Sequence, residues 1–130
     1  MATRSVIGVM HGDIYKVVYC HWDGYPGPAG VGYLLKEHYD SAKANNLIAL
    51  GDISALGREI GEKHDFDSIY TGMTKFYGRD RGDTDVEYKT FQNFESLLVY
   101  VDAVGAEYGY IMKDDVWYMF DSENTNLVLL

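Results

Sequence analysis

The sequence is short of cysteine and of long apolar runs, and both shortages exclude classes of protein. Cys20 is the only cysteine in 130 residues, so no disulfide can form within the chain, which fits a reducing compartment. No apolar run reaches the roughly 18 residues that a membrane span needs, and the first residues lack the apolar core of a signal peptide. We therefore expect a cytoplasmic protein that does not contact a membrane.

Basic residues are also scarce, above all in the C-terminal part of the chain. Residues 1–81 carry ten acidic and nine basic residues (−1), whereas residues 82–130 carry ten acidic residues against Lys89 and Lys113 (−8), which gives the net charge of −9. Nucleic-acid binding depends on lysines and arginines that neutralise phosphates, so we expect no direct binding to nucleic acid. The acidic part is compatible with mimicry of nucleic acid toward a basic host protein, or with a plain solvated surface.

Motifs of well-known chemistry are missing too. The glycine-rich loop over residues 24–32 lacks the GxGxxG spacing and is not followed by the GK[ST] of a phosphate-binding loop. No two histidines have the spacing of a zinc motif, and a single cysteine excludes CxxC sites. His64 alternates with Asp65 and Asp67 like a set of metal ligands, but a polar loop or cap explains this short pattern better. We predict no metal site and no bound cofactor.

Apolar and aromatic residues, by contrast, are plentiful enough for one globular domain. Apolar residues make up 47% of the chain and aromatic residues 15%, mostly through twelve tyrosines. Tyrosine joins an apolar ring to a polar tip and suits half-buried positions and interfaces, so the chain is also compatible with a homo-oligomer. We expect a single domain over residues 1–130.

The periodicity of apolar residues predicts the order of strands and helices. Strands are expected on either side of a turn at residues 11–13, from residue 74 into a charged turn, over 86–91, and in a closing hairpin over 107–121. Helices are expected over 31–40, over 41–51 with Asp40 or Ser41 as N-cap, and over 93–105 with Asn93 as N-cap, and short helical turns over 52–64. This order predicts an α+β fold, an antiparallel sheet built from hairpins with two or three helices packed on one face.

The strand expected over residues 14–22 is unusual because neither of its faces is cleanly polar. Tyr15, Val17, Tyr19 and His21 fall on one face, and Val18 and Cys20 are among the residues of the other. We therefore expect this strand to be central, or covered on both sides.

The loop after that strand, "HWDGYPGPAGVG", allows two interpretations. Its glycines and the start of the following helix could present backbone N–H groups to an anion or nucleotide, or the loop could be a plain strand-to-helix turn. His21 and Asp23 lie two residues apart and could pair as an oriented base. A local nucleophile is missing, because Cys20 points to the opposite strand face and no serine has a GxSxG context. We keep His21, Asp23 and His64 as weak catalytic candidates and do not expect a covalent hydrolase.

The segment "FYGRDRG" concentrates arginine in a chain that is otherwise poor in bases. Arg79 and Arg81 adjoin Phe76 and Tyr77, and arginine matches phosphate or carboxylate while tyrosine can stack on a base. The alternative is that Asp80 and Asp83 simply pair with these arginines in a solvated turn. The residues that we expect to line an aromatic and basic ligand pocket are Arg79, Arg81, Tyr77, Trp22, Tyr25, Arg4 and His21.

Several blocks resemble a family of small proteins encoded by tailed bacteriophages. They are "MATRSVIGV", "YCHWDGYPGPAGVGYLLKEHY", "LIALGDISALG", "IGEKHDFD", "FYGRDRGD" and "EYGYIMKDDVWYMF", which together extend over nearly the whole chain. The resemblance carries no catalytic or binding residue with it. It implies a protein made in the cytoplasm of an infected bacterium, where small accessory phage proteins often inhibit host enzymes or counter host defence.

Three functions remain open from the sequence. The first is a binding protein that sequesters a nucleotide-like anionic signal in the aromatic and arginine pocket. The second is an acidic inhibitor that binds a host defence protein, with nucleic-acid mimicry as one form of it. The third is a small nucleotide-cleaving enzyme that uses His21 with Asp23, or His64. We favour the binding protein, because it explains the largest number of sequence features.

Overall fold

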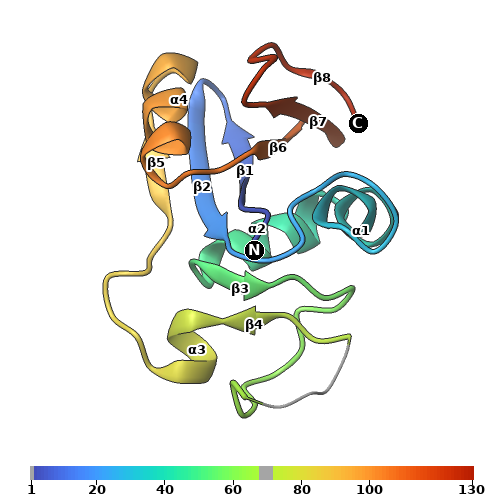
Figure 1. Ribbon diagram of the computed structural model, residues 1–130, viewed down its shortest axis with the longest axis vertical. Helices are drawn as coiled ribbons and strands as arrows, with labels where there is room; N and C mark the ends of the chain where they lie inside the picture. Colours follow the sequence, from blue (N-terminus) through green and yellow to red (C-terminus); the bar gives the residue numbers. More distant parts are fainter. Residues whose placement is uncertain (1, 68–71) are drawn as a thin grey trace.

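A computed structural model describes residues 2–67 and 72–130 of the chain (Figure 1). In chain order its elements are β1 (Ser5–His11), β2 (Ile14–Cys20), α1 (Val31–His38), α2 (Ser41–Ala49), β3 (Ile53–Ala55), β4 (Lys75–Phe76), α3 (Tyr77–Arg81), β5 (Lys89–Phe91), α4 (Phe94–Ala103), β6 (Tyr108–Lys113), β7 (Val116–Asp121) and β8 (Val128–Leu129). Within the described ranges the strands form one eight-stranded sheet in the order β4-β3-β2-β1-β6-β7-β8, with β5 paired to β2. The predicted α+β fold is confirmed.

Both predicted hairpins are present and have two-residue turns. His11 pairs with Ile14 at the end of the β1–β2 hairpin, where Gly12 has a φ of +61°. Asp114 and Asp115 connect β6 to β7 with φ values of 52° and 64°. In the β6–β7 turn, positive φ at both central residues gives a twist that matches the twist of the flanking strands.

The sheet is mixed, although we expected an antiparallel one. β1 runs parallel to β6, from Ser5 opposite Tyr108 to Val9 opposite Met112. This direction arises because the chain leaves α4 beside the start of β1, where the Glu107 N–H donates to the Arg4 carbonyl at 2.8 Å. β2 also has a parallel neighbour, since Cys20 pairs with Ile53 of β3.

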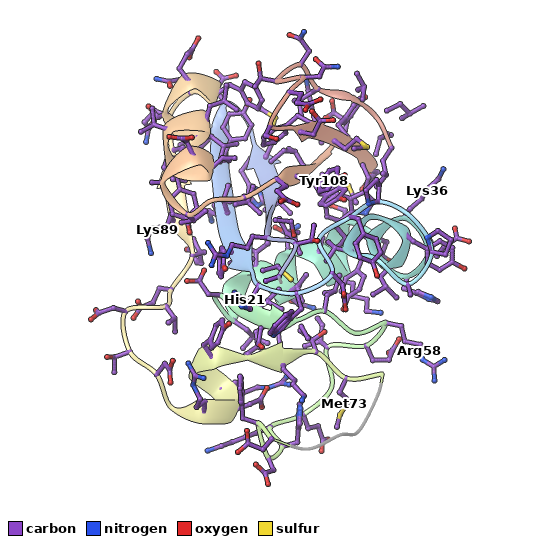
Figure 2. All side chains as sticks on the ribbon, in the orientation of Figure 1. His21, Lys36, Arg58, Met73, Lys89 and Tyr108 are labelled. Carbon is purple, nitrogen blue, oxygen red and sulfur yellow. The ribbon has the colours of Figure 1, made fainter. Side chains whose placement is uncertain are left out.

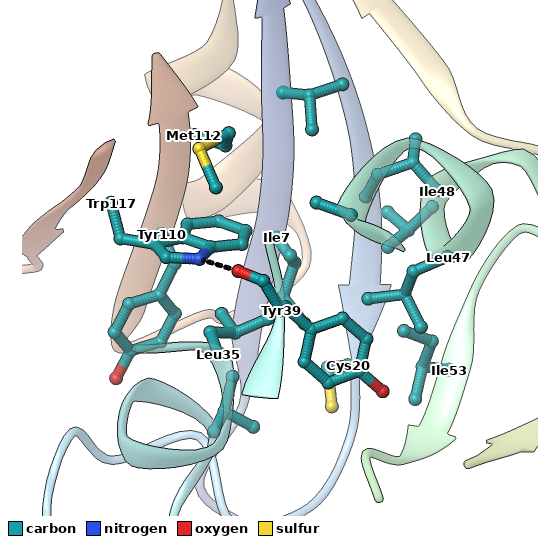
Figure 3. Close-up of a cluster of buried hydrophobic side chains, with 14 of the residues drawn as sticks. Ile7, Cys20, Leu35, Tyr39, Leu47, Ile48, Ile53, Tyr110, Met112 and Trp117 are labelled. Atoms are coloured by element: carbon teal, nitrogen blue, oxygen red, sulfur yellow. Dashed lines mark hydrogen bonds between the residues drawn. The ribbon is translucent and has the colours of Figure 1, made fainter. Parts of the chain in front are cut away.

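Helices cover both faces of the central strands. α1 and α2 pack on the face of the sheet that carries Ile7 and Val18, as expected for two helices on one side. Figure 3 shows this cluster, in which the Trp117 indole N–H donates to the Tyr39 carbonyl. α4 packs on the other face, against Val6 and other residues of a second cluster. The apolar residues on both faces of β2 are the reason, because each face needs its own cover.

Helix ends follow the sequence signals closely. The Asp40 side chain accepts the Lys43 N–H at 2.8 Å at the start of α2, and the Asn93 side chain accepts the Ser96 N–H at 2.8 Å at the start of α4. Gly51, with a φ of +87°, follows the end of α2 as expected. None of the helices in residues 2–67 and 72–130 is long and apolar enough to span a bilayer.

Two local expectations were wrong. Residues 53–55 form a strand instead of a helical turn. A short apolar run is compatible with either conformation, and here the end of β2 offers the backbone of this run a strand to pair with. Residues 77–81 form a short helix instead of an irregular turn. The Asp80 carboxylate accepts the Phe76 N–H at 2.8 Å near the start of this helix, and Gly82 ends it with a φ of +82°.

Candidate ligand-binding site

The loop between β2 and α1 uses its backbone donors internally. The N–H groups of Val31 and Gly32, which begin α1, donate to the carbonyls of Asp23 and Tyr25 at 2.8 and 3.3 Å. The Gly30 N–H donates to the Gly27 carbonyl at 2.9 Å. These are the groups that an anion would need at a helix N-terminus. The arrangement favours the interpretation of this loop as a structural corner rather than an anion cradle.

The same loop is fixed to the sheet from both sides. Gly24 donates its N–H to the Thr3 carbonyl at 2.8 Å and accepts a hydrogen bond from the buried Tyr110 hydroxyl at 2.6 Å. Tyr25 folds its ring over Gly30, where an added Cβ would meet a ring carbon at 2.5 Å. Tyr25 therefore acts as a packing residue of the corner.

Arg79 and His64 belong to a network around a buried carboxylate. The Asp80 side chain is fully buried and accepts hydrogen bonds from Arg79 Nε at 2.9 Å and from the His64 N–H at 3.1 Å. Arg79 also donates to the carbonyls of Gly61 and Thr74, both at 3.0 Å. These contacts tie the "GEKHDFD" and "FYGRDRG" blocks together, so Arg79 is engaged in structure and we do not place it in a binding site.

Arg81 is held between aromatic rings at the surface. Its guanidinium carbon lies 4.7 Å from the ring centroids of Phe66 and Tyr77. Its Nε and Nη2 atoms donate to the two carboxylate oxygens of Asp83 at 2.9 and 2.6 Å. The charge of Arg81 is thus compensated by Asp83, as the alternative interpretation of the sequence predicted, while the guanidinium still supports the ring of Tyr77.

Other predicted ligand residues do come together, at the end of the sheet where β1 begins and β2 ends. Figure 2 shows His21 there, between the central strands and the lower part of the molecule formed by β3, β4 and α3. The Tyr19 hydroxyl lies 2.6 Å from His21 Nδ1, and the rings of His21 and Trp22 are perpendicular with centroids 4.7 Å apart. Arg4 is close enough to influence the pKa of both Tyr19 and His21.

We call this group the Tyr19 cluster; its members are Arg4, Tyr19, His21, Asp52, Tyr77 and Tyr100. Sequence reasoning missed Asp52 and Tyr100. Asp52 lies just after α2 and accepts the Tyr19 N–H at 2.9 Å, and its charge acts on the pKa of Tyr77 and Tyr100. Neither residue stands in a motif, and only the folded chain brings them beside β2.

The Tyr19 cluster combines neutral hydrogen-bond donors with one cation, Arg4, and one carboxylate, Asp52. Burial raises the pKa of Tyr19, Tyr77 and Tyr100, so their hydroxyls keep their protons near neutral pH. Burial, and to a smaller extent the charge of Arg4, lowers the pKa of His21, so its ring is neutral at pH 7. Burial also raises the pKa of Asp52, against the opposing effects of the Tyr19 N–H and Lys89.

Arg4 is the exposed cation of the cluster and lies at the C-terminal end of α4. Its Nη1 atom would be 3.0 Å from a Cβ added at Gly105, the residue that follows the α4 C-cap with a φ of +72°. The negative end of the helix dipole favours a guanidinium there. Among residues 2–67 and 72–130, no carboxylate lies within ion-pair distance of Arg4. Arg4 is therefore available to an anion.

The catalytic pair suggested by the sequence is not formed. Nδ1 of His21 is engaged by Tyr19, and no hydrogen bond joins His21 to the carboxylate of Asp23 in the part of the chain that the structure describes. The φ of Asp23 is +57°, which turns the chain into the corner. His64 points its Nδ1 at the Glu62 carbonyl, 2.8 Å away, and the Asp67 N–H donates to Asp65 at 3.1 Å. No group of three potential metal ligands clusters among the described residues.

A separate groove of about 650 Å³ lies between the end of α1 and the strands β7 and β8. Its floor includes the buried Trp117 and Met112, and its rim includes Glu37 and Asp115. Leu129, which is 71% exposed, lies along one side. None of the ligand residues predicted from the sequence lines this groove.

Two groups of acidic residues that follow residue 82 lie far apart in the fold. Val86, which lies next to Asp85, accepts the Asp52 N–H at 2.8 Å beyond the end of β2, whereas Asp114 and Asp115 lie in the turn next to the far ends of β1 and β6. These two acidic groups therefore lie at opposite ends of the central strands.

Comparison of the chain with protein-family models, with curated proteins and with solved structures gave no match.

Proposed function

We propose that the protein captures a small nucleotide-like anion at the Tyr19 cluster. Arg4 binds the anionic group, His21 and Tyr77 donate hydrogen bonds, and the exposed ring of Trp22 stacks on the base. One observation carries this proposal: Arg4 and Tyr77 both lie close enough to Tyr19 to influence its pKa, Tyr19 contacts His21 Nδ1 at 2.6 Å, and no carboxylate in the described ranges pairs with Arg4. Since His21 is bonded to Tyr19 and not to Asp23, the geometry supports capture better than cleavage.

The sequence resemblance supplies the proposed biological context. A phage accessory protein in the cytoplasm of an infected bacterium would, by holding such a ligand, withdraw a host signal and so counter host defence or alter host metabolism. Sequestration of this kind needs affinity and abundance but no turnover, which agrees with a cluster of neutral donors around one arginine.

The test is recovery of the ligand from the protein purified from infected cells. Heat denaturation should release the ligand intact, and mass spectrometry should identify it, whereas an enzyme would release a product. Arg4→Ala should retain at least about tenfold less ligand, because a charge-assisted hydrogen bond is lost. Arg58→Ala is the matched control, since Arg58 is an exposed arginine that Figure 2 shows pointing away from His21. Equal recovery from the Arg4→Ala and wild-type proteins would contradict the proposal.

Trp22 gives an independent test of the same site. Trp22→Leu should weaken capture by roughly tenfold, because stacking of a base on an aromatic ring contributes about 1–3 kcal/mol. Tyr33→Leu on α1 is the control, because Tyr33 and Trp22 are both 44% exposed. If both variants lose the same amount of ligand, the base does not stack on Trp22.

The groove beside β7 favours a second candidate, an inhibitor that binds a basic host protein. The three carboxylates of its lining (Glu37, Asp40 and Asp115) outnumber its one lysine, Lys36, and together with the exposed Leu129 they match a segment with basic and apolar side chains. The double variant Glu37→Gln and Asp115→Asn should then weaken co-purification of a host protein. Neutralising Glu95 and Asp102 on α4, on the other face of the sheet, is the control with the same change in charge. Unchanged co-purification would exclude the groove as the docking surface.

A further inference from the structure

The outer side of β8 is an open edge of the sheet. β8 pairs with β7, and no other strand in residues 2–67 and 72–130 pairs with it. Figure 1 shows β8 near the end of the molecule opposite to β4, the strand at the other edge of the sheet. An edge strand presents backbone groups to which the strand of another chain can be added.

Leu129 is the residue of β8 that presents these groups. It lies opposite Tyr118, and the next residue, Leu130, donates its N–H to the Trp117 carbonyl at 3.1 Å. Along an antiparallel pair, residues that bond to the partner strand alternate with residues that do not. Because Leu130 bonds to β7, the N–H and C=O of Leu129 point away from β7. One residue therefore offers both a donor and an acceptor at the open edge.

The side chains of β8 do not protect this edge. Natural edge strands avoid pairing with other chains through charged residues, prolines or bulges. β8 consists of Val128 and Leu129, which are 45% and 71% exposed. An edge strand with exposed apolar side chains and free backbone groups favours a further strand beside it.

The groove beside β8 indicates which side chains that further strand carries. Leu129 lines this groove, and the buried Trp117 forms part of its floor. The lining also includes Glu37 and Asp115, and neither carboxylate has an ion-pair partner among residues 2–67 and 72–130. An apolar side chain fits the floor of the groove, and basic side chains match the two unpaired carboxylates.

The same charges disfavour a second copy of this chain as the occupant. The net charge of the chain is −9, and β8 itself brings no basic residue. Two copies joined through β8 would place the carboxylates of both grooves at one interface, where like charges repel. The complementary occupant is a basic segment of another protein.

We propose that β8 binds an extended segment of a partner protein as an additional strand, with an apolar side chain over Trp117 and basic side chains next to it on the same face. The proposal rests on the groove as a docking surface, which is the second candidate function above, and adds the conformation of the segment that docks there. Backbone hydrogen bonds with Leu129 hold the segment, and its alternate side chains enter the groove.

The probe for this proposal is a blocked synthetic peptide, Thr-Lys-Thr-Val-Thr-Lys-Thr, whose valine and lysines lie on one face of a strand. NMR titration should give a Kd below about 1 mM and slower hydrogen exchange of the Leu129 N–H in the complex. The same peptide with glutamate in place of lysine should bind at least about tenfold more weakly. Absence of binding at millimolar concentration, equal binding of both peptides, or unchanged exchange at Leu129 would overturn the proposal.

Two variants of one residue separate the backbone from the side chain. Leu129→Pro removes the outward N–H and leaves the neighbouring residues to pair with β7, as proline does on natural edge strands. Leu129→Ala loses the same exposed leucine but keeps the N–H, and is the matched control. The proline variant should bind the lysine peptide at least roughly fivefold more weakly than the alanine variant, the contribution of one backbone hydrogen bond. Equal affinities of two variants with native backbone spectra would contradict strand addition, and exchange at Leu129 in the wild type decides if the proline variant does not fold.

Failure of the docking surface is distinguished from failure of strand addition. If co-purification of a host protein depends on Glu37 and Asp115 but the peptide leaves the Leu129 N–H unprotected, the groove binds its partner in another conformation and strand addition is wrong. If co-purification does not depend on these carboxylates while the peptide protects Leu129, the edge accepts a strand and the second candidate function is wrong. A dimer of the free protein that Leu129→Pro dissociates would show that a second copy occupies β8, which would also overturn the proposal.

Discussion

The indole N–H of Trp117 donates a hydrogen bond to the backbone carbonyl of Tyr39 at 2.9 Å and so joins residues 78 positions apart (Figure 3). This bond is buried, and it connects β7 to the segment between α1 and α2. Trp117→Phe should lower the free energy of unfolding by about 2 kcal/mol, because it leaves the carbonyl without a partner and removes part of a core ring. Urea denaturation measures the change.

The control for this prediction is Trp22→Phe, because Trp22 is 44% exposed and its indole is not part of the core. Its effect should stay within about 0.5 kcal/mol, as is usual for surface positions. If Trp117→Phe lowers the free energy of unfolding as little as Trp22→Phe does, the bond between Trp117 and Tyr39 contributes little to stability.

Gly30 is needed for space and not for its backbone conformation. Its φ is −86°, which any residue adopts, but an added Cβ would lie 2.2 Å from the Tyr25 carbonyl oxygen. Gly30→Ala should therefore destabilise the protein by about 2 kcal/mol or more through overpacking. In contrast, Gly27→Ala in the same loop meets nothing within 4 Å and should be neutral or slightly stabilising. Thermal unfolding of the two variants checks this, and equal midpoints would contradict the packing of this corner.

Asp80 should make stability depend on pH at the acidic end. Burial raises the pKa of its carboxyl, but hydrogen bonds from Arg79, Phe76 and His64 outweigh that effect and hold the pKa below its ordinary value. A carboxyl with a lowered pKa in the folded state contributes stability above its unfolded pKa, and this contribution is lost as pH falls through the folded value. We expect the wild-type protein to lose stability below about pH 4.

Asp80→Asn is the variant that isolates this contribution. It should be less stable than the wild type at pH 7, and the difference between the two proteins should shrink on acidification. Urea midpoints at several pH values give the comparison, and a difference that stays constant with pH would show that Asp80 is not the group responsible.

Cys20 should be chemically inert in the folded protein. Burial raises the pKa of its thiol to about 12, and the side chain is fully buried between the two central strands and the helices. Because the thiolate is the reactive form, iodoacetamide should label Cys20 far more slowly in the native state than in urea at about pH 8. Mass spectrometry follows the labelling, and comparable rates would mean that this end of β2 opens readily.

The proposed site could be predicted only in part. Arg4, His21, Trp22 and Tyr77 were reachable from the sequence, because arginine and aromatic residues stand out in an acidic chain. The sequence predicted Arg79 as a ligand residue on the same grounds, but in the structure its side chain belongs to the network around Asp80. A pattern shows that an arginine is present, but only its neighbours in space decide whether its donors are free.

The sequence by itself determined the local structure. The two hairpin turns, the N-caps Asp40 and Asn93 and the glycines that end α2 and α4 act through contacts a few residues apart, so a short stretch contains the whole interaction. Apolar residues on both faces of β2 likewise required a covered central strand.

The tertiary structure decided what depends on partners far along the chain. Residues 53–55 form a strand because they pair with the end of β2. β1 and β6 are parallel because α4 brings the chain back to the end of the sheet where β1 begins. Asp52 and Tyr100 joined Tyr19 for the same reason. Such contacts depend on loop closure and on the packing of whole elements, and no short stretch of sequence contains both partners.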